Sequence, residues 1–378
     1  MNTHSNTLRV GLLMAVGVIT AATQALSDQG PSHRFRATNN GVVAITSIGQ
    51  RTGDYCARDR ALLFEDPSGV RVLYDPGVTV AGGLDPRLGV VHAVLVTHSH
   101  FDHIGYRKLA QNPDDPNAVC DPIPSPYTVP APNTTAAEIA AAKNSAVLVN
   151  GSMAQFLSQK IQKLTGNPTD TCPPKGVAVG AGPDEIVVPL ARPCTGGLAF
   201  GSKIVLTTSS GTPGVRVNLV NAVHSDSLFN PALLFTAPLA GYMVENGLTG
   251  FDGSAAGYVL AFTNGLTVYL TGDTGLTSDM SMFRKLYEPN LAVVNVDGVN
   301  VMGPEDAAFA VNSLVKPTSV IVSHAEQAVT TNGQMNPNTR TAVFASLVDD
   351  LPVYLPLSGV TMQFNGAGRC VSGCTLAR

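Results

Sequence analysis

The stretch of residues 97–103, which reads THSHFDH, constrains the fold of this chain more than any other feature. It follows the nearly continuous apolar run 90–97, which is typical of a strand buried on both faces. In extended backbone His98 and His100 project to the same side, so both can bind one metal ion. The last two residues of the stretch stand where a helix is expected to begin, near 104–110, and can reach a second, neighbouring position. Imidazole and carboxylate groups suit Zn²⁺, Mn²⁺ or Fe²⁺. The stretch therefore predicts a metal site, with a solvated loop or a structural metal clip as the alternatives, and its candidate ligands are His98, His100, Asp102 and His103.

Three later segments repeat one pattern, an apolar strand that leads into a residue able to bind metal. In α/β sheets functional residues gather at the carboxyl ends of strands, so these residues are expected to converge on the histidine cluster. Taken singly, each can also be a capping or surface residue. His92 lies within the apolar run and is interpreted as a hydrogen-bonded core or edge histidine. The three pairs are strand 215–223 with His224, strand 266–271 with Asp273, and strand 320–323 with His324.

Strand and helix patterns interleave from residue 41 onward. Asn264-Gly265 lies between two strand patterns and is the strongest short hairpin signal. Several neighbouring strands pair as hairpins, which predicts mixed sheets and not a purely parallel one. The expected helices are 153–164, 278–287, 304–315 and 338–348, and the other expected strands include 42–48, 61–65, 70–74, 203–208, 256–263 and 291–296.

Charge and composition narrow the choice of partner. The net charge is −4, charged residues make up 13%, and no run of Lys or Arg forms a stripe. Phosphate binding needs clustered positive charge, so nucleic acid is not the expected partner. A chain with 37 Gly and 26 Pro is expected to have many tight turns between short strands.

The first residues are expected to be a signal peptide, residues 1–27. An apolar run, 10–22, follows Arg9 and precedes small residues, and it is too short to span a bilayer comfortably. Cleavage can follow Ala25 or Ser27, and an uncleaved membrane anchor is the alternative. No later segment is apolar enough to cross a membrane. The mature protein is therefore expected in the periplasm or outside the cell.

Export makes the cysteines interpretable, because an even number in an oxidising compartment predicts disulfides. Their pairing stays open, and a cysteine zinc site is the alternative, although the sequence contains no CxxC pair. Residues 111–201 are rich in Pro, Asn and Ala and hold three cysteines. We interpret this range as an insertion over the core, a possible lid, with an ordinary part of the core as the alternative. The disulfide candidates are Cys56, Cys120, Cys172, Cys194, Cys370 and Cys374.

With these residues the chain resembles the metallo-β-lactamase superfamily, whose HxHxDH motif matches residues 98–103. Residues 268–275 (VYLTGDTG), 278–280 (SDM) and 302–308 (MGPEDAA) resemble the branch of metal-dependent hydrolases related to ascorbate-6-phosphate lactonase. The resemblance implies an α+β fold, an αββα four-layer sandwich, for a domain of residues 38–370.

The resemblance also implies roles for the candidate residues. One metal ion would be held by His98, His100 and His224, and the second by Asp102, His103 and His324, with Asp273 bridging them. Asp75 matches an aspartate that braces the histidine-bearing loop by hydrogen bonds. The chain departs from the family at Ala325-Glu326-Gln327, where an aromatic and proline-containing run is usual, and in the range 111–201.

These ligands imply a hydrolase that binds two divalent ions per chain, Zn ahead of Mn or Fe. A metal-bound hydroxide would attack a lactone, ester or amide in a small-molecule substrate, and Asp102 would steer it or pass its proton to the leaving group. A phosphodiesterase is the alternative enzyme. A β-lactamase fits less well, because β-lactamases generally lack an aspartate at the Asp273 position. A non-catalytic metal-binding or adhesion protein is the alternative outside enzymes.

Overall fold

The computed structural model describes residues 37–106, 133–173, 184–225 and 253–377, together with 1, 120, 227–228, 238, 241–242, 245–246 and 250–251. Contacts divide the chain into two units, Met1–Ser32 and His33–Arg378, and every helix and strand of the described residues belongs to the second unit. The signal peptide predicted for residues 1–27, with cleavage after Ala25 or Ser27, lies outside the described residues apart from residue 1. Within the described part of the chain, none of the helices has the length and apolar character to cross a membrane.

Two nine-stranded sheets form the centre of the second unit. In the first sheet β1 to β3 pair antiparallel, whereas β3, β4, β5 and β8 run parallel. Its order is β21 (Cys370–Ser372), β20 (Thr361–Phe364), β1 (Val43–Ser47), β2 (Leu62–Glu65), β3 (Arg71–Tyr74), β4 (Ala93–Leu95), β5 (Ala146–Asn150), β8 (Cys194–Leu198) and β6 (Asp170–Thr171).

The second sheet is also mixed. Strands β14, β15, β16 and β19 are parallel, and β13 pairs antiparallel with both β10 and β14. The hairpin predicted at Asn264-Gly265 is confirmed, with Ala261 opposite Thr267 and Gly265 at φ +93°. The order is β22 (Thr375–Leu376), β19 (Val353–Leu355), β16 (Ser319–Ser323), β15 (Leu291–Asn295), β14 (Thr267–Leu270), β13 (Ala256–Ala261), β10 (Pro213–Asn221), β9 (Lys203–Thr208) and β7 (Glu185–Val188). Two-stranded ribbons pair β11 (Ser227–Leu228) with β12 (Gly250–Phe251) and β17 (Thr330–Thr331) with β18 (Gln334–Met335).

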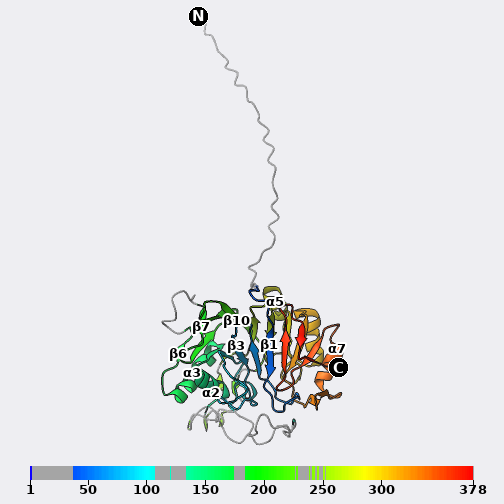
Figure 1. Ribbon diagram of the computed structural model, residues 1–378, viewed down its shortest axis with the longest axis horizontal. Helices are drawn as coiled ribbons and strands as arrows, with labels where there is room; N and C mark the ends of the chain where they lie inside the picture. Colours follow the sequence, from blue (N-terminus) through cyan, green and yellow to red (C-terminus); the bar gives the residue numbers. More distant parts are fainter. Residues whose placement is uncertain are drawn as a thin grey trace. The chain divides into compact units, whose positions relative to one another are not determined.

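Helices cover the outer face of each sheet, which gives the four layers of an αββα sandwich (Figure 1). One buried cluster joins the inner faces of the two sheets, where the rings of Phe64 and Phe262 stack at 5.9 Å. Because they are covered on both faces, β5 and β15 are buried at every position and have no polar alternation. The predicted fold class is therefore confirmed. The first sheet is covered by α2 (Thr135–Lys143) and α3 (Gly151–Thr165), and the second by α5 (Asp279–Tyr287), α6 (Pro304–Phe309), the π-helix η2 (Ala310–Val315) and α7 (Arg340–Leu347).

Two local predictions differ from the structure. The strand expected over 90–97 is shortened to β4. Before β4, His92 N–H donates to Arg71 O of β3, and after β4, Thr97 N–H donates to the side chain of Asp75, the residue that follows β3. A short helix, α1 (Phe101–Ile104), begins before the helix expected near 104–110, and Gly105 at φ +76° ends it. Residues 107–110 of the expected helix lie outside the described residues.

The prediction that residues 111–201 form an insertion over the core does not hold for the described part of that range. Strands β5, β6 and β8 belong to the first sheet, β7 belongs to the second, and α2 and α3 cover the first sheet. These residues are an ordinary part of the core, which was the alternative. The rest of the range, 111–119, 121–132 and 174–183, lies outside the described residues.

All six cysteines pair, as Cys56–Cys120, Cys172–Cys194 and Cys370–Cys374. The second disulfide joins the start of β8 to the residue after β6, and the third closes a loop between β21 and β22. This pairing leaves no cysteine for the alternative of a cysteine zinc site.

Candidate metal centre

The predicted ligands follow the carboxyl ends of strands that point to one edge of the sandwich. In the second sheet β10, β14 and β16 share one direction, and His224, Asp273 and His324 follow them in the chain. The histidine cluster follows β4 of the first sheet. Because parallel strands end at the same edge, residues far apart in the sequence meet there. The structure brings together all seven predicted ligands, His98, His100, Asp102, His103, His224, Asp273 and His324.

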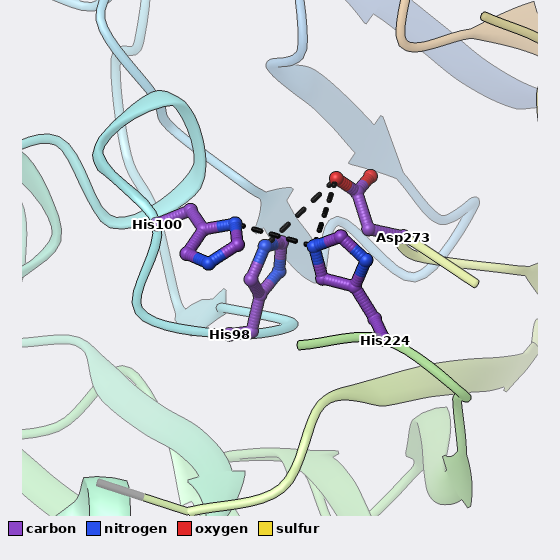
Figure 2. A group of neighbouring side chains, drawn as sticks. All are labelled: His98, His100, His224 and Asp273. Atoms are coloured by element: carbon purple, nitrogen blue, oxygen red, sulfur yellow. Dashed lines mark hydrogen bonds and ion pairs between the residues drawn. The ribbon is translucent and has the colours of Figure 1, made fainter. Parts of the chain in front are cut away.

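Four of these residues form what we call the first group: His98, His100, His224 and Asp273, whose ligand atoms all lie within 4.8 Å of one another. Figure 2 shows their side chains pointing toward one another. His224 Nε2 lies 3.2 Å from His100 Nδ1. Asp273 Oδ2 is 3.8 Å from Nε2 of both His98 and His224. The loops after β4, β10 and β14 each contribute to this group.

The second group consists of Asp102, His103 and His324, whose ligand atoms also lie within 4.8 Å of one another. Asp102 Oδ2 lies 3.7 Å from His103 Nε2 and 3.8 Å from His324 Nε2. Asp273 reaches this group as well, because its Oδ2 is 3.3 Å from His103 Nε2 and 2.7 Å from His324 Nε2. One carboxylate oxygen therefore stands between the two groups, the position expected of a bridging ligand.

The imidazoles of the first group are held in the neutral form. Burial lowers the pKa of His98 well below its usual range, and the neighbouring His103 lowers it further. Burial and His224 lower the pKa of His100 to about 4. His98 Nε2 is buried without a hydrogen-bond partner among the described residues, with Asp273 Oδ2 at 3.8 Å. A neutral ring with an unsatisfied nitrogen in such a cluster is the form that binds a metal ion.

Negative charge dominates the second group. Burial opposes ionisation of Asp102, but His103 and Arg60 outweigh it and hold the pKa of that carboxyl well below its usual range. The pKa of Asp273 is also held well below its usual range, because the effects of His103 and His324 outweigh that of burial. The pKa of His103 is raised well above its usual value, since Asp273 and Asp75 outweigh the effect of burial. Carboxylates thus stabilise positive charge at this position, and the residues present fit a divalent ion.

Asp75 makes the contacts that were predicted for it. Its Oδ1 accepts a hydrogen bond from Thr97 N–H at 2.8 Å, and its Oδ2 accepts from Thr97 Oγ1 at 3.0 Å. His103 Nδ1 lies 2.9 Å from Asp75 Oδ2. With its Nδ1–H donated to Asp75, the ring of His103 turns Nε2 toward Asp273.

Several residues at the site were missed by the sequence reasoning. A pocket of about 360 Å³ opens beside both groups, and its lining includes apolar Phe101, Val299 and Val301. The missed charged residues lie far from the histidine cluster in the sequence and follow no spacing rule. The one sequence signal that could have indicated any of them is the segment that contains Glu326, which departs from the family pattern. These residues are Arg58, Asp297, Glu326 and Arg340 in the pocket lining, and Arg60 behind it.

A larger pocket, of about 620 Å³, lies between α5 and η2. Its lining includes Arg284 and Lys316 and contains none of the seven predicted ligands. Five of the seven predicted ligands line the smaller pocket instead.

Comparison with known proteins finds one matching family model and several similar metal-dependent hydrolases. Residues 61–173, which include the histidine cluster, match the family model of the metallo-beta-lactamase superfamily. The chain is 26% identical over 275 residues to a UPF0173 metal-dependent hydrolase of Cupriavidus taiwanensis, covering 71% of this chain and 72% of that protein. It is 27% identical over 307 residues to a UPF0173 metal-dependent hydrolase of Polynucleobacter asymbioticus, covering 79% and 81%. Among solved structures, Igni18, a metallo hydrolase from Ignicoccus hospitalis, aligns with a TM-score of 0.49 at 20% identity, over 86% of this chain and 99% of that one. The narrower likeness to the branch related to ascorbate-6-phosphate lactonase stays a prediction.

Proposed function

Because the chain has the metallo-β-lactamase fold, we propose that it is a metal-dependent hydrolase that binds two divalent ions, one at each group. The observation that carries this proposal is the position of Asp273, whose Oδ2 lies within 3.8 Å of Nε2 atoms from both groups. The names of its relatives, metal-dependent hydrolases, support the reaction class. Nitrogen and carboxylate ligands favour Zn²⁺ ahead of Mn²⁺ or Fe²⁺.

Divalent ions held by these residues would supply Lewis acidity and would activate a water near neutral pH. The residues of the chain prepare that chemistry. Asp273 offsets part of the positive charge at both positions, and Asp75 holds the ring of His103. His103 and then Arg60 hold the pKa of Asp102 well below its usual range, and two arginines donate hydrogen bonds to its Oδ2. Its permanent charge favours the role of orienting the attacking group over that of passing a proton.

The pocket suits a small molecule that carries both apolar and polar groups. Its volume of about 360 Å³ is in the range of small-molecule sites. The lining includes the apolar side chains of Phe101, Val299 and Val301 as well as the charged side chains of Arg58 and Arg340. We propose a lactone, ester or amide as the bond that is cleaved, with a phosphodiester as the second candidate.

A substrate panel tests this proposal. Metal-depleted protein is assayed with and without added Zn²⁺ or Mn²⁺ on chromogenic lactones, esters, amides, phosphodiesters and a cephalosporin. We expect metal-dependent turnover of a lactone, ester or amide, and loss of most of it in His100→Ala. Turnover of the phosphodiester alone would assign the second candidate. Metal binding without turnover of any member would favour the non-catalytic alternative.

We also propose that the protein is exported to the periplasm or the cell exterior. The pairing of all six cysteines supports this, because disulfides persist in oxidising compartments. Fractionation of the native host tests the location, and recovery of the protein in the cytosol with its leader attached would contradict it.

A further inference from the structure

Four charged side chains, among them Asp102 of the second group, form a closed network. Arg58 Nη1 donates to Asp102 Oδ2 at 2.9 Å, and Arg60 donates to the same oxygen through Nη2 at 3.0 Å and Nε at 3.3 Å. Arg60 Nη2 also donates to Glu326 Oε1 at 2.7 Å, and Arg58 Nη2 pairs with Glu326 Oε2. Each arginine therefore contacts both carboxylates.

Burial shows what Arg60 does in this network. Its side chain is 1% exposed, and burying a guanidinium costs free energy unless charged and polar partners replace its water. Its partners are Asp102, Glu326 and the carbonyl oxygen of Ala325, to which Nη1 donates at 3.1 Å. Arg60 thus links Asp102 in α1 to the segment that follows β16.

That segment begins with His324 of the second group. His324 has φ +57° and Arg58 has φ +66°, a region that residues other than glycine rarely adopt. Arg58 N–H donates to Ala325 O at 2.8 Å, so the same carbonyl is held from two directions. The contacts hold the strained turn in the conformation that brings His324 Nε2 to 3.8 Å from Asp102 Oδ2.

We propose that Arg58 and Arg60 are positioning residues that set the distance between Asp102 and His324, and with it the affinity of the second group for its ion. The inference rests on the proposed function. The contacts described above involve Asp102 and the two residues that follow His324. Replacement of either arginine is therefore expected to leave the ion affinity of the first group unchanged. Glu326, at the point where the chain departs from its family, completes the network on the His324 side.

Titration of metal-depleted protein with Zn²⁺ against a chromophoric chelator measures the two affinities separately. Arg60→Lys keeps the charge but loses the planar fork that contacts both carboxylates. We expect its affinity for the second ion to fall about 10- to 100-fold, as when other residues that orient metal ligands are replaced, with the first affinity within about threefold of wild type. Arg58→Lys should act in the same direction. The matched control is Arg87→Lys, because Arg87 binds Asp85 and the carbonyl of Thr79 in another arginine–carboxylate network; it should keep both affinities.

If both lysine variants bind both ions with wild-type affinity, the inference is overturned. An equal loss of affinity at both groups would also overturn it, because it indicates a general loss of structure. If Arg60→Lys does not fold, Arg58→Lys and Glu326→Gln decide, since these side chains are 21% and 31% exposed. A wild-type protein that binds no ion would contradict the proposed function itself, and the inference would fall with it.

Discussion

Asp273 is the residue on which the two groups depend together. In the proposed two-ion centre its carboxylate would offset the charge of both ions, whereas an amide of the same shape is neutral and binds through one oxygen. We therefore expect Asp273→Asn to lower turnover by about 10²- to 10³-fold. If Asp273 merely capped the turn after β14, its replacement would cost about 1 kcal/mol of stability and leave turnover intact.

Turnover, metal content and Tm measured on one preparation of Asp273→Asn separate these two hypotheses. Full metal content with near wild-type turnover would show that Asp273 does not bridge the groups, and it would reopen the β-lactamase alternative.

His92 is a residue whose protonation should affect stability and not catalysis. Its Nδ1 accepts a hydrogen bond from Arg71 N–H at 2.9 Å, which requires the unprotonated ring, and burial and then Arg71 lower its pKa. As the pH falls, His92 is protonated in the unfolded chain before it is protonated in the folded chain. The stability that its hydrogen bond contributes above about pH 6.5 is therefore lost as the pH falls below that value and through the lower pKa of the folded chain.

Asparagine keeps an acceptor near the position of Nδ1 but does not titrate. We expect wild type to lose stability relative to His92→Asn as the pH falls from 7.5 to 5, by urea unfolding of both proteins. A constant difference across that range would show that His92 is protonated equally in both states.

At the scale of elements, the predictions that succeeded rest on local patterns. The apolar run before His98 and the Asn264-Gly265 turn each specify their own structure, and the strand-end pattern places His224 and His324 at one edge. The arginine pair could not be predicted, because Arg60 meets Asp102 only after β2 and β4 take their places in the first sheet. The ligands that the sequence suggests are thus local signals, while the residues that position them depend on the assembled sandwich.

The error over residues 111–201 has a similar cause. Its Pro, Asn and Ala content indicated an insertion, yet β5 reads AVLVN and is buried throughout. A short apolar run bounded by polar segments is a buried strand as readily as part of a lid, and pairing with β4 decides between them.

The disulfide between Cys172 and Cys194 holds β6 against β8, and the two cysteines are separated by 22 positions in the sequence. Closing a loop of this length restricts the unfolded chain, so the Cys172→Ala/Cys194→Ala variant should lose about 2–4 kcal/mol of unfolding free energy. Its metal content should not change, because the pair lies away from both groups.

The control is Cys370→Ala/Cys374→Ala. These cysteines are separated by only 4 positions, so their disulfide should contribute less to stability. Denaturant unfolding of both variants measures which of the two loses more unfolding free energy. Mass mapping that finds Cys172 and Cys194 reduced in exported protein would contradict the pairing.

At the scale of the whole molecule, the site joins the two sheets. The cluster after β4 belongs to the first sheet, while the other three ligands follow strands of the second. Ions bound here would therefore link the sheets and would bind the folded chain in preference to the unfolded one. We expect chelation to lower Tm and added Zn²⁺ to restore it, since free ion at about 1,000 times its Kd stabilises the folded state by about 4 kcal/mol. Thermal unfolding with and without chelator measures the shift, and it should be smaller in His100→Ala.

The central claim is that this chain assembles a two-ion centre from His98, His100, Asp102, His103, His224, Asp273 and His324. Elemental analysis of reconstituted protein after removal of free metal tests it most directly. The account predicts close to two divalent ions per chain in the wild type, and markedly fewer in His100→Ala. Reconstituted wild-type protein without bound metal would contradict the account.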